Sequence, residues 1–209
     1  MDQAELMFRG MVAWWDASDI EKKMVALEPL DYYPGGVCGR DREGDFVMWG
    51  RYGAIDPSSF MSSFHVKEVQ LEAARRYALV HHMHREDAKR LNEPIEGISR
   101  GHYQMQAVLD VQGLGWRHTG TAGYGALKMV LKIPGFMFPE TLKRAIIVRP
   151  PKIFYFIWSI VKLFIDPETV KKIVVVSGNH PLKEIEKFIH IRYTVFFFFS
   201  LPTTRVLET

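Results

Sequence analysis

The sequence predicts an α/β protein built on a largely parallel sheet. Three short apolar runs, at residues 105–109, 145–148 and 173–176, are separated by segments of helix length. These runs are almost continuously apolar, which is typical of parallel strands covered on both faces. A chain of 209 residues that is 47% hydrophobic and 24% charged has the size and composition of one globular domain, alone or with an appendage. A disordered chain and a fibrous repeat are therefore excluded.

Helices are predicted at the start of the chain. Apolar residues recur at helical spacing over residues 3–15, which predicts a short amphipathic helix. Ser18 followed by Glu21 forms a capping box, which predicts that a second short helix begins there.

A hairpin and a long helix follow. Residues 37–40 and 46–51 flank the turn sequence at 41–44, which predicts two antiparallel strands. Residues 64–91 carry an apolar stripe at helical spacing, and Pro94 closes that segment. The elements ahead of the sheet are thus helical apart from this hairpin.

Two more helices are expected between the three apolar runs. The first begins near Tyr124 and ends before Pro134, and the second covers residues 153–164 after two prolines. Only Tyr155, Ser159 and Lys162 interrupt the apolar character of the second helix. A helix that is apolar nearly all round is either deeply buried or lines an apolar cavity, and the sequence leaves both alternatives open.

Charge and cysteine content restrict the compartment and the partners. Residues 1–60 carry 6 basic and 11 acidic side chains, whereas residues 141–209 carry 11 and 5. The basic end suits an anionic surface, but a net charge of +3 is too small to argue for a nucleic-acid partner. The single cysteine, the acidic N-terminus without a signal-peptide core and the lack of a 20-residue apolar run predict a cytoplasmic protein.

No motif predicts an enzyme. Gly113 and Gly115 follow a predicted strand, but the third glycine of a dinucleotide-binding fingerprint is replaced by His118. Cys38 lies in a glycine-rich turn, where a small residue is needed for structural reasons. Neither a nucleophile elbow nor a phosphate-binding loop occurs, so no cofactor is expected.

Three histidines on the long helix raise the question of a metal. His81, His82 and His84 include spacing that could chelate a metal ion, but carboxylate or cysteine partners at matching positions are not evident. His84 continues the apolar stripe, and the other two are expected to be more exposed. We therefore predict a mixed surface and core-edge cluster without a metal site.

Several segments resemble, in order and spacing, motifs of the CRAL-TRIO lipid-binding domain family, closest to its supernatant protein factor or tocopherol-associated branch. They are residues 33–44 (YPGGVCGRDREG), 110–115 (DVQGLG), 138–144 (FPETLKR), 151–154 (PKIF) and 164–173 (FIDPETVKKI). The resemblance implies a parallel-rich sheet floor, flanking helices and an apolar pocket closed by a mobile gate helix, here residues 153–164. It assigns residues 1–29 to the remnant of an N-terminal helical module, 30–187 to a C-terminally incomplete lipid-binding domain and 188–209 to a divergent tail.

The resemblance also implies a function and a set of residues. The protein would bind a hydrophobic lipid, such as phosphatidylinositol or a tocopherol, and transfer or present it at membranes that it visits transiently. The headgroup would contact Glu140, Thr169 and Lys172, although Glu140 could instead cap or pair with Lys143 or Arg144. The residues expected in the gate and the pocket are Phe154, Ile157, Trp158, Val161, Met105 and Ala107.

Some positions depart from the family pattern. Met105 and Ala107 stand where members that also carry phosphatidylcholine have hydroxyl residues, so we do not expect choline-lipid binding there. The Phe-rich segment after Tyr193 replaces the family's own ending, and we interpret it as translated intron or an alternative last exon. Two alternatives to lipid transfer stay open: a lipid-sensing scaffold or regulator, and a truncated chain without function.

Overall fold

In the computed structural model, residues 35–63, 66–91, 104–127, 141–177 and 181–190 are described, together with residues 5, 9, 10 and 13. They fall into two compact units. The first comprises residues 1–31, 56–104 and 117–143, and the second comprises residues 32–55, 105–116 and 144–209. The four described residues of the predicted N-terminal helix are helical, and Glu5 pairs with Arg9 at 2.8 Å.

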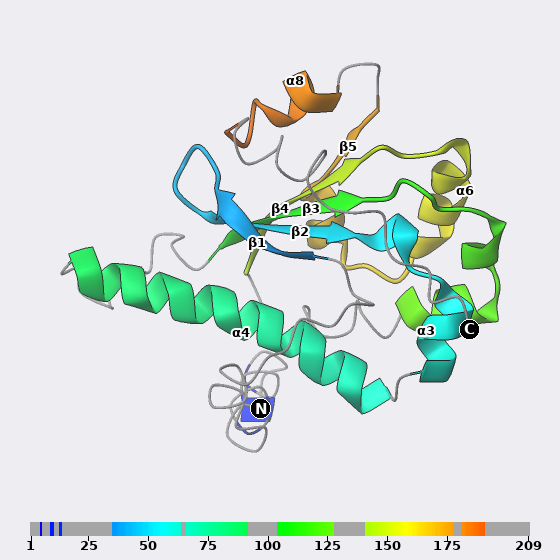
Figure 1. The fold of residues 1–209 in the computed structure, drawn as a ribbon, viewed down its shortest axis with the longest axis horizontal. Coiled ribbons are helices and arrows are strands. Elements are labelled where there is room, and N and C mark those ends of the chain that lie inside the picture. Colours follow the sequence, from blue (N-terminus) through cyan, green and yellow to red (C-terminus); the bar gives the residue numbers. More distant parts are fainter. Residues whose placement is uncertain are drawn as a thin grey trace. The chain divides into compact units, whose positions relative to one another are not determined.

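The second unit is organised around a five-stranded sheet whose strand order is the order of the strands in the chain (Figure 1). Its strands are β1 (Gly35–Arg40), β2 (Phe46–Arg51), β3 (Met105–Asp110), β4 (Leu142–Val148) and β5 (Ile173–Val176). The pair β1 and β2 is antiparallel, as predicted for the hairpin, whereas β2 pairs with β3 and β4 with β5 in parallel. The α/β class with a largely parallel sheet is thus confirmed.

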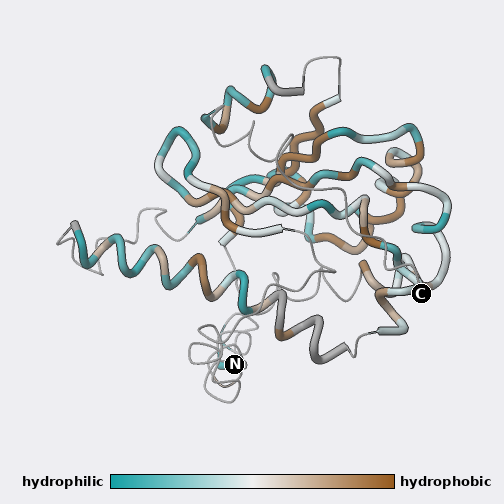
Figure 2. Tube along the Cα trace, viewed as in Figure 1, coloured by the Kyte–Doolittle hydropathy of each residue, from teal (hydrophilic) through white to brown (hydrophobic). Residues whose placement is uncertain are grey.

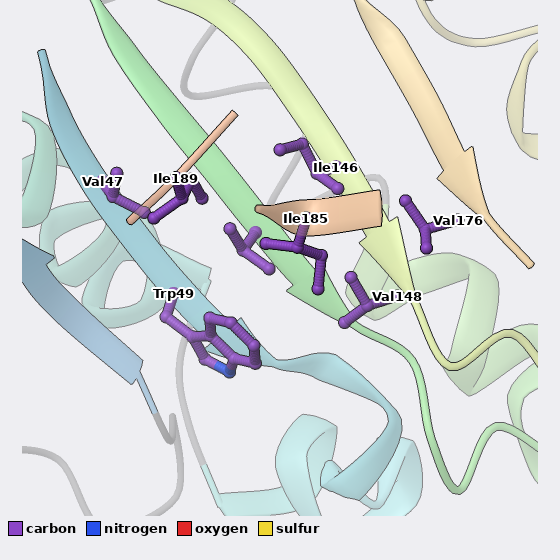
Figure 3. Packing of buried hydrophobic residues seen from close by; sticks show 8 residues of the cluster. Val47, Trp49, Ile146, Val148, Val176, Ile185 and Ile189 are labelled. Atoms are coloured by element: carbon purple, nitrogen blue, oxygen red, sulfur yellow. The ribbon is translucent and has the colours of Figure 1, made fainter. Parts of the chain in front are cut away.

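One face of the sheet packs against α8 (Pro181–Ile185) and the residues after it. Val47, Trp49, Ile146 and Val148 point to this face, and they form a cluster with Ile185 (Figure 3). The other members are Val108, Val176 and Ile189. The last of these, although it lies beyond the predicted boundary at residue 187, is only 2% exposed.

The opposite face packs against α6 (Lys152–Val161). Ile147, the neighbour of Ile146 in β4, joins Phe154 and Val111 in a second buried cluster. Because successive residues of a strand point to opposite faces, these two clusters show that the sheet is covered on both sides. Figure 2 shows the corresponding apolar character of β4, β5 and α6.

The first unit contains the long predicted helix. This helix, α4, covers Val66–Leu91, in agreement with the predicted range of 64–91. Residues 121–127 are also helical, whereas residues 128–131 of the helix predicted near Tyr124 lie outside the described residues. No helix in the described part of the chain combines the length and hydropathy needed to cross a bilayer.

Two short helices have no counterpart in the periodicity of the sequence. They are α3 (Pro57–Ser63) and α7 (Pro167–Lys171), and each begins with proline directly after an aspartate. Asp56 Oδ1 accepts the backbone N–H of Ser59 at 2.8 Å. An Asp-Pro pair at a helix start provides a cap and a fixed φ, so this dipeptide could have predicted the start of each helix.

A buried polar chain crosses the α8 face of the sheet. The Asp41 carboxylate, in the β1–β2 turn, accepts from Gln106 Nε2 at 2.8 Å. Gln106 Oε1 in turn accepts from Arg144 Nη1 at 3.2 Å, and the Arg144 guanidinium lies 4.5 Å from the Phe188 ring centre. Asp41 and Gln106 are 3% and 1% exposed, so each needs the other to satisfy its polar atoms. These hydrogen bonds connect the β1–β2 hairpin to β3 and β4.

Candidate functional site

The helix predicted at residues 153–164 is present as α6, but it ends three residues earlier than expected, at Val161. The backbone forms a tighter turn after Val161. There, Leu163 N–H donates to Ile160 O at 3.1 Å, and Phe164 N–H donates to Val161 O at 3.0 Å. Such bonds to the third residue back are typical of a helix that is ending. The apolar pattern continues past this point, which explains why the prediction was too long.

The inner side of α6 is buried, as a helix that covers the sheet requires. Phe154, Ile157 and Val161 are each less than 8% exposed. Phe154 stacks on Trp158, with ring centres 6.1 Å apart and an angle of 11° between the rings. The same pair packs with Ile147 of β4. All four predicted gate residues therefore belong to the sheet-facing half of this helix or its edge.

The outer side of α6 is exposed, which excludes the alternative of a deeply buried helix. Tyr155 and Phe156 are 51% and 50% exposed. Trp116, which follows the turn after β3, is 72% exposed, and its ring centre lies 6.0 Å from that of Phe156. We call this set the outer aromatic patch, and it consists of Trp116, Tyr155, Phe156, Leu163 and Phe164. Sequence reasoning gave Trp116 no role, since only the fold brings it beside α6.

Two lysines flank the part of the outer aromatic patch that lies on α6. Lys152 and Lys162 lie at the two ends of α6 and are exposed. Residues 150–165 contain no aspartate or glutamate. An apolar surface framed by lysines and free of acidic groups within its own segment is compatible with an anionic lipid surface.

The two predicted pocket residues on the sheet lie on the α6 side. Met105 and Ala107 are buried in β3. Leu109, two residues further along β3, packs against the cluster that contains Phe154. Because alternate residues of a strand point to the same face, Met105 and Ala107 point to the α6 face as well.

Two of the three predicted headgroup residues lie on one helical turn. Asp166 caps α7 and accepts the backbone N–H groups of Glu168 and Thr169, at 2.9 and 3.3 Å. Lys172 N–H then donates to Thr169 O at 3.0 Å, and Ala145 N–H donates to Lys172 O at 3.0 Å. Thr169 therefore lies in α7, and Lys172 lies between α7 and β5, next to β4. Glu140 lies outside the described residues.

A buried carboxylate marks the carboxyl end of β3. Asp110 is 1% exposed, and Arg149 binds both of its oxygens, with Nε 3.0 Å from Oδ1. Arg51 Nε lies 3.7 Å from Oδ2, and Gln112 N–H donates to Oδ1 at 3.1 Å. Gly113 in the following turn has φ 94°, a conformation that favours glycine. The glycine-rich turn is thus structural, and no phosphate-binding geometry is needed to explain it.

Cys38 lies in β1, and His82 and His84 lie in α4. Burial raises the pKa of the Cys38 thiol to about 12, so at neutral pH it is protonated and a poor nucleophile. His84 is 6% exposed and its Nε2 lies 3.1 Å from Gln104 O, while His82 is exposed, as predicted. Within the described ranges, no group of three or more His, Cys, Asp or Glu residues is arranged to hold a metal ion.

Several known proteins are similar in sequence to this chain. Phosphatidylinositol/phosphatidylcholine transfer protein SFH12 of Arabidopsis thaliana is 32% identical over 161 residues, which cover 76% of this chain and 28% of that protein. Phosphatidylinositol/phosphatidylcholine transfer protein SFH4 of the same plant is 29% identical over 194 residues, which cover 89% of this chain and 31% of that protein. Protein real-time of Drosophila melanogaster is 29% identical over 143 residues, which cover 68% of this chain and 21% of that protein.

This chain therefore spans about a fifth to a third of the length of these curated relatives. A crystal structure of Sfh5 aligns with a TM-score of 0.47 and 21% identity, over 72% of this chain and 49% of that one. A family model of the CRAL/TRIO domain matches residues 30–197, which is most of the sequence. The chain belongs to the CRAL/TRIO domain family.

Proposed function

We propose that this protein binds a hydrophobic lipid in an apolar pocket bounded by α6 and transfers or presents that lipid at a membrane surface, without catalysing a reaction. The observation that carries the proposal is the two-sided apolar character of α6. Its inner side packs on the sheet through Phe154, and its outer side exposes Tyr155 and Phe156. The names of the plant relatives, which describe phosphatidylinositol/phosphatidylcholine transfer, support the same function.

The energetics of lipid release explain why such a helix needs an apolar outer side. Two acyl chains carry about 30 methylenes, each worth roughly 0.8 kcal/mol when buried, so escape into water is too slow to be useful. Release has to occur into a bilayer. A helix that opens there exchanges its protein contacts for acyl chains rather than for water, and nearby lysines attract anionic headgroups at about 1 kcal/mol each.

Lipid binding and transfer are tested together on the purified full chain. Native mass spectrometry should show a bound species of defined lipid mass, and labelled lipid should move between donor and acceptor vesicles. A chain that is folded and lipid-free, and that moves no labelled lipid, would refute the proposal. A chain that holds lipid but does not accelerate its transfer would favour a lipid-sensing scaffold or regulator.

We also propose that Glu140, Thr169 and Lys172 hold a phosphoinositide headgroup. Replacing Lys172 with alanine should weaken phosphatidylinositol uptake by about 10- to 100-fold, the value of one charge-assisted hydrogen bond, and leave uptake of a tocopherol unchanged. The measurement is uptake of each labelled ligand from vesicles.

The matched control for that experiment is the neighbouring Lys171, which is exposed and pairs with Glu168 at 2.6 Å. Lys171→Ala removes the same charge from the same helix and should leave both ligands bound as in the parent. Equal loss of both ligands in Lys172→Ala would show that Lys172 is structural.

The outer aromatic patch gives a separate prediction about membrane contact. Changing both Tyr155 and Phe156 to serine should lower binding to vesicles of mixed phosphatidylcholine and phosphatidylserine by at least tenfold, because two large side chains lose their burial in the interface. The thermal midpoint should change little, since both side chains are about half exposed. Vesicle co-sedimentation measures the first quantity.

Leu79 on α4, 36% exposed, supplies the control for exposed apolar area. Leu79→Ser should leave vesicle binding at the parent level. A similar decrease in both proteins would mean that general hydrophobicity, and not the outer aromatic patch, causes membrane binding.

A further inference from the structure

Three charged side chains meet where the parallel strands end. Arg51 is the last residue of β2, Asp110 is the last residue of β3, and Arg149 directly follows β4. Arg51 is opposite Asp110 in the strand register, and Val111 N–H donates to Val148 O at 3.1 Å, so these positions share one edge of the sheet. We call Arg51, Asp110 and Arg149 the edge cluster. The carboxyl ends of parallel strands are the usual place for ligands in open α/β sheets.

The Asp110 carboxylate is already used by partners within the chain. Arg149 binds both of its oxygens, with Nε 3.0 Å from Oδ1, and Gln112 N–H donates to Oδ1 at 3.1 Å. A bidentate pair is stronger and better oriented than a single contact. Arg149, and not Arg51, is therefore the main counter-ion of Asp110.

Arg51 keeps donors that Asp110 does not use. Its Nε lies 3.7 Å from Asp110 Oδ2, which is an ion-pair distance but too long for a hydrogen bond. Its guanidinium forms no hydrogen bond with another residue in the described part of the chain. The side chain is nevertheless only 19% exposed. Because partly buried donors need acceptors, this arrangement favours an acceptor supplied by a ligand.

The charge of the edge cluster favours an anion. It contains two guanidinium groups and one carboxylate. Arginine keeps its positive charge in proteins, so the cluster does not become neutral by losing a proton. Arg149 is 22% exposed, similar to Arg51, so a solute can reach both side chains. A phosphate group suits such a site, because its oxygens match the guanidinium fork and it carries negative charge.

We propose that the edge cluster binds a phosphate group, with Arg51 as the main ligand and Arg149 as a second positive charge. The ligand is a small phosphate-bearing anion, either a soluble compound or the headgroup of a lipid. The backbone of the glycine-rich turn after Asp110 takes no part in this site.

The edge cluster is separate from the proposed headgroup residues Thr169 and Lys172. Lys172 directly precedes β5, whose first residue pairs with Ala145 of β4. It therefore lies about five residues away from Arg149 along the strands, or roughly 16 Å at ~3.3 Å per residue. Phosphate binding by the edge cluster consequently does not depend on the headgroup residues or on lipid transfer.

Isothermal titration calorimetry of the purified full chain with inorganic phosphate tests the site, with chloride at equal ionic strength as the reference. The parent should bind phosphate saturably, and Arg51→Met should lower the affinity at least tenfold. Arg51→Lys keeps the charge but loses the fork, so its affinity should lie between the two. Acetate, the carboxylate probe, should bind the parent at least fivefold more weakly than phosphate, and equal affinities would overturn the assignment to phosphate.

Asp110→Asn gives a result that a structural role of the cluster does not predict. Removing the negative charge should raise the phosphate affinity at least threefold, because the carboxylate repels the anion and competes for both guanidinium groups. An unchanged or lower affinity in folded Asp110→Asn would overturn the proposal. Should this variant fail to fold, the comparison of Arg51→Met with Arg51→Lys decides.

Arg90→Met is the matched control, because Arg90 also pairs with an aspartate, Asp87 at 3.2 Å, but is 74% exposed on α4. It removes the same charge and should leave the phosphate affinity of the parent unchanged. The proposal is overturned if the parent shows no saturable binding, if Arg51→Met binds like the parent, or if Arg90→Met loses as much affinity as Arg51→Met.

Vesicles of phosphatidylcholine with and without phosphatidic acid distinguish the two sources of phosphate. If the ligand is a lipid headgroup, Arg51→Met should bind the phosphatidic acid vesicles at least fivefold more weakly than the parent, and inorganic phosphate should compete. If the ligand is soluble, both proteins bind these vesicles equally and only the calorimetric difference remains. A chain that transfers no lipid would refute the proposed function, whereas the calorimetry would still decide whether the edge cluster binds phosphate.

Discussion

Replacing Asp41 with alanine should lower the free energy of unfolding by about 3 to 5 kcal/mol. The carboxylate accepts the N–H groups of Glu43 and Asp45, at 2.8 and 2.9 Å, besides the amide of Gln106. Each buried donor left without an acceptor costs about 1–3 kcal/mol; the Asp45 N–H and the Gln106 amide are buried here, and the Glu43 N–H is partly buried. Urea unfolding followed by circular dichroism measures the change.

Two companion variants show whether the buried network is responsible. Asp41→Asn keeps one oxygen for the turn and should lose about half as much stability as the alanine variant. Glu43→Ala, in the exposed part of the same turn, should change the free energy of unfolding by less than about 0.5 kcal/mol. A loss below about 1 kcal/mol in Asp41→Ala would contradict the role assigned to this network.

Acid should destabilise the protein through His81. Burial lowers the pKa of its imidazole from 6.5 to about 4, helped by the neighbouring charges of His84 and Arg85. Because the unfolded chain binds this proton more readily than the folded one, the contribution of His81 is complete above pH 6.5. It is lost as the pH falls from about 6.5 to about 4, and the full loss is roughly 3 kcal/mol.

The pH dependence of the urea midpoint tests this contribution. Between pH 6.5 and 4, the free energy of unfolding should fall less in His81→Gln than in the parent, and the difference should equal the contribution of His81. The remaining groups titrate in both proteins. His82→Gln, on the exposed side of α4, should keep the slope of the parent. A His81→Gln profile parallel to that of the parent would assign the acid sensitivity to other groups.

Local sequence patterns predicted those elements whose own residues determine them. β5 at 173–176 and the β1–β2 hairpin were predicted to within two residues, because apolar runs there end at turn sequences. The helices α3 and α7, at seven and five residues, are too short to show a helical period. The end of α6 was placed wrongly because hydrophobicity continues where the helix stops.

Contacts between distant parts of the chain were beyond prediction. Asp41 and Gln106 are 65 residues apart, and Asp110 and Arg149 are 39 apart, so no spacing rule links them. For the same reason, the contact between Trp116 and Phe156 could not be predicted from the sequence. Thr169 and Lys172 could be named from a family motif, because a motif preserves residues that the fold brings together.

The opposite orientation of neighbouring residues in β4 and β5 has an evolutionary consequence. Ile146, Val148 and Val176 serve the cluster under α8, while Ile147, Ile173 and Val175 serve the cluster under α6. Even-numbered and odd-numbered positions of the same strands therefore belong to different layers. Mutations can change the layer under α6, one residue at a time, while the layer under α8 remains intact.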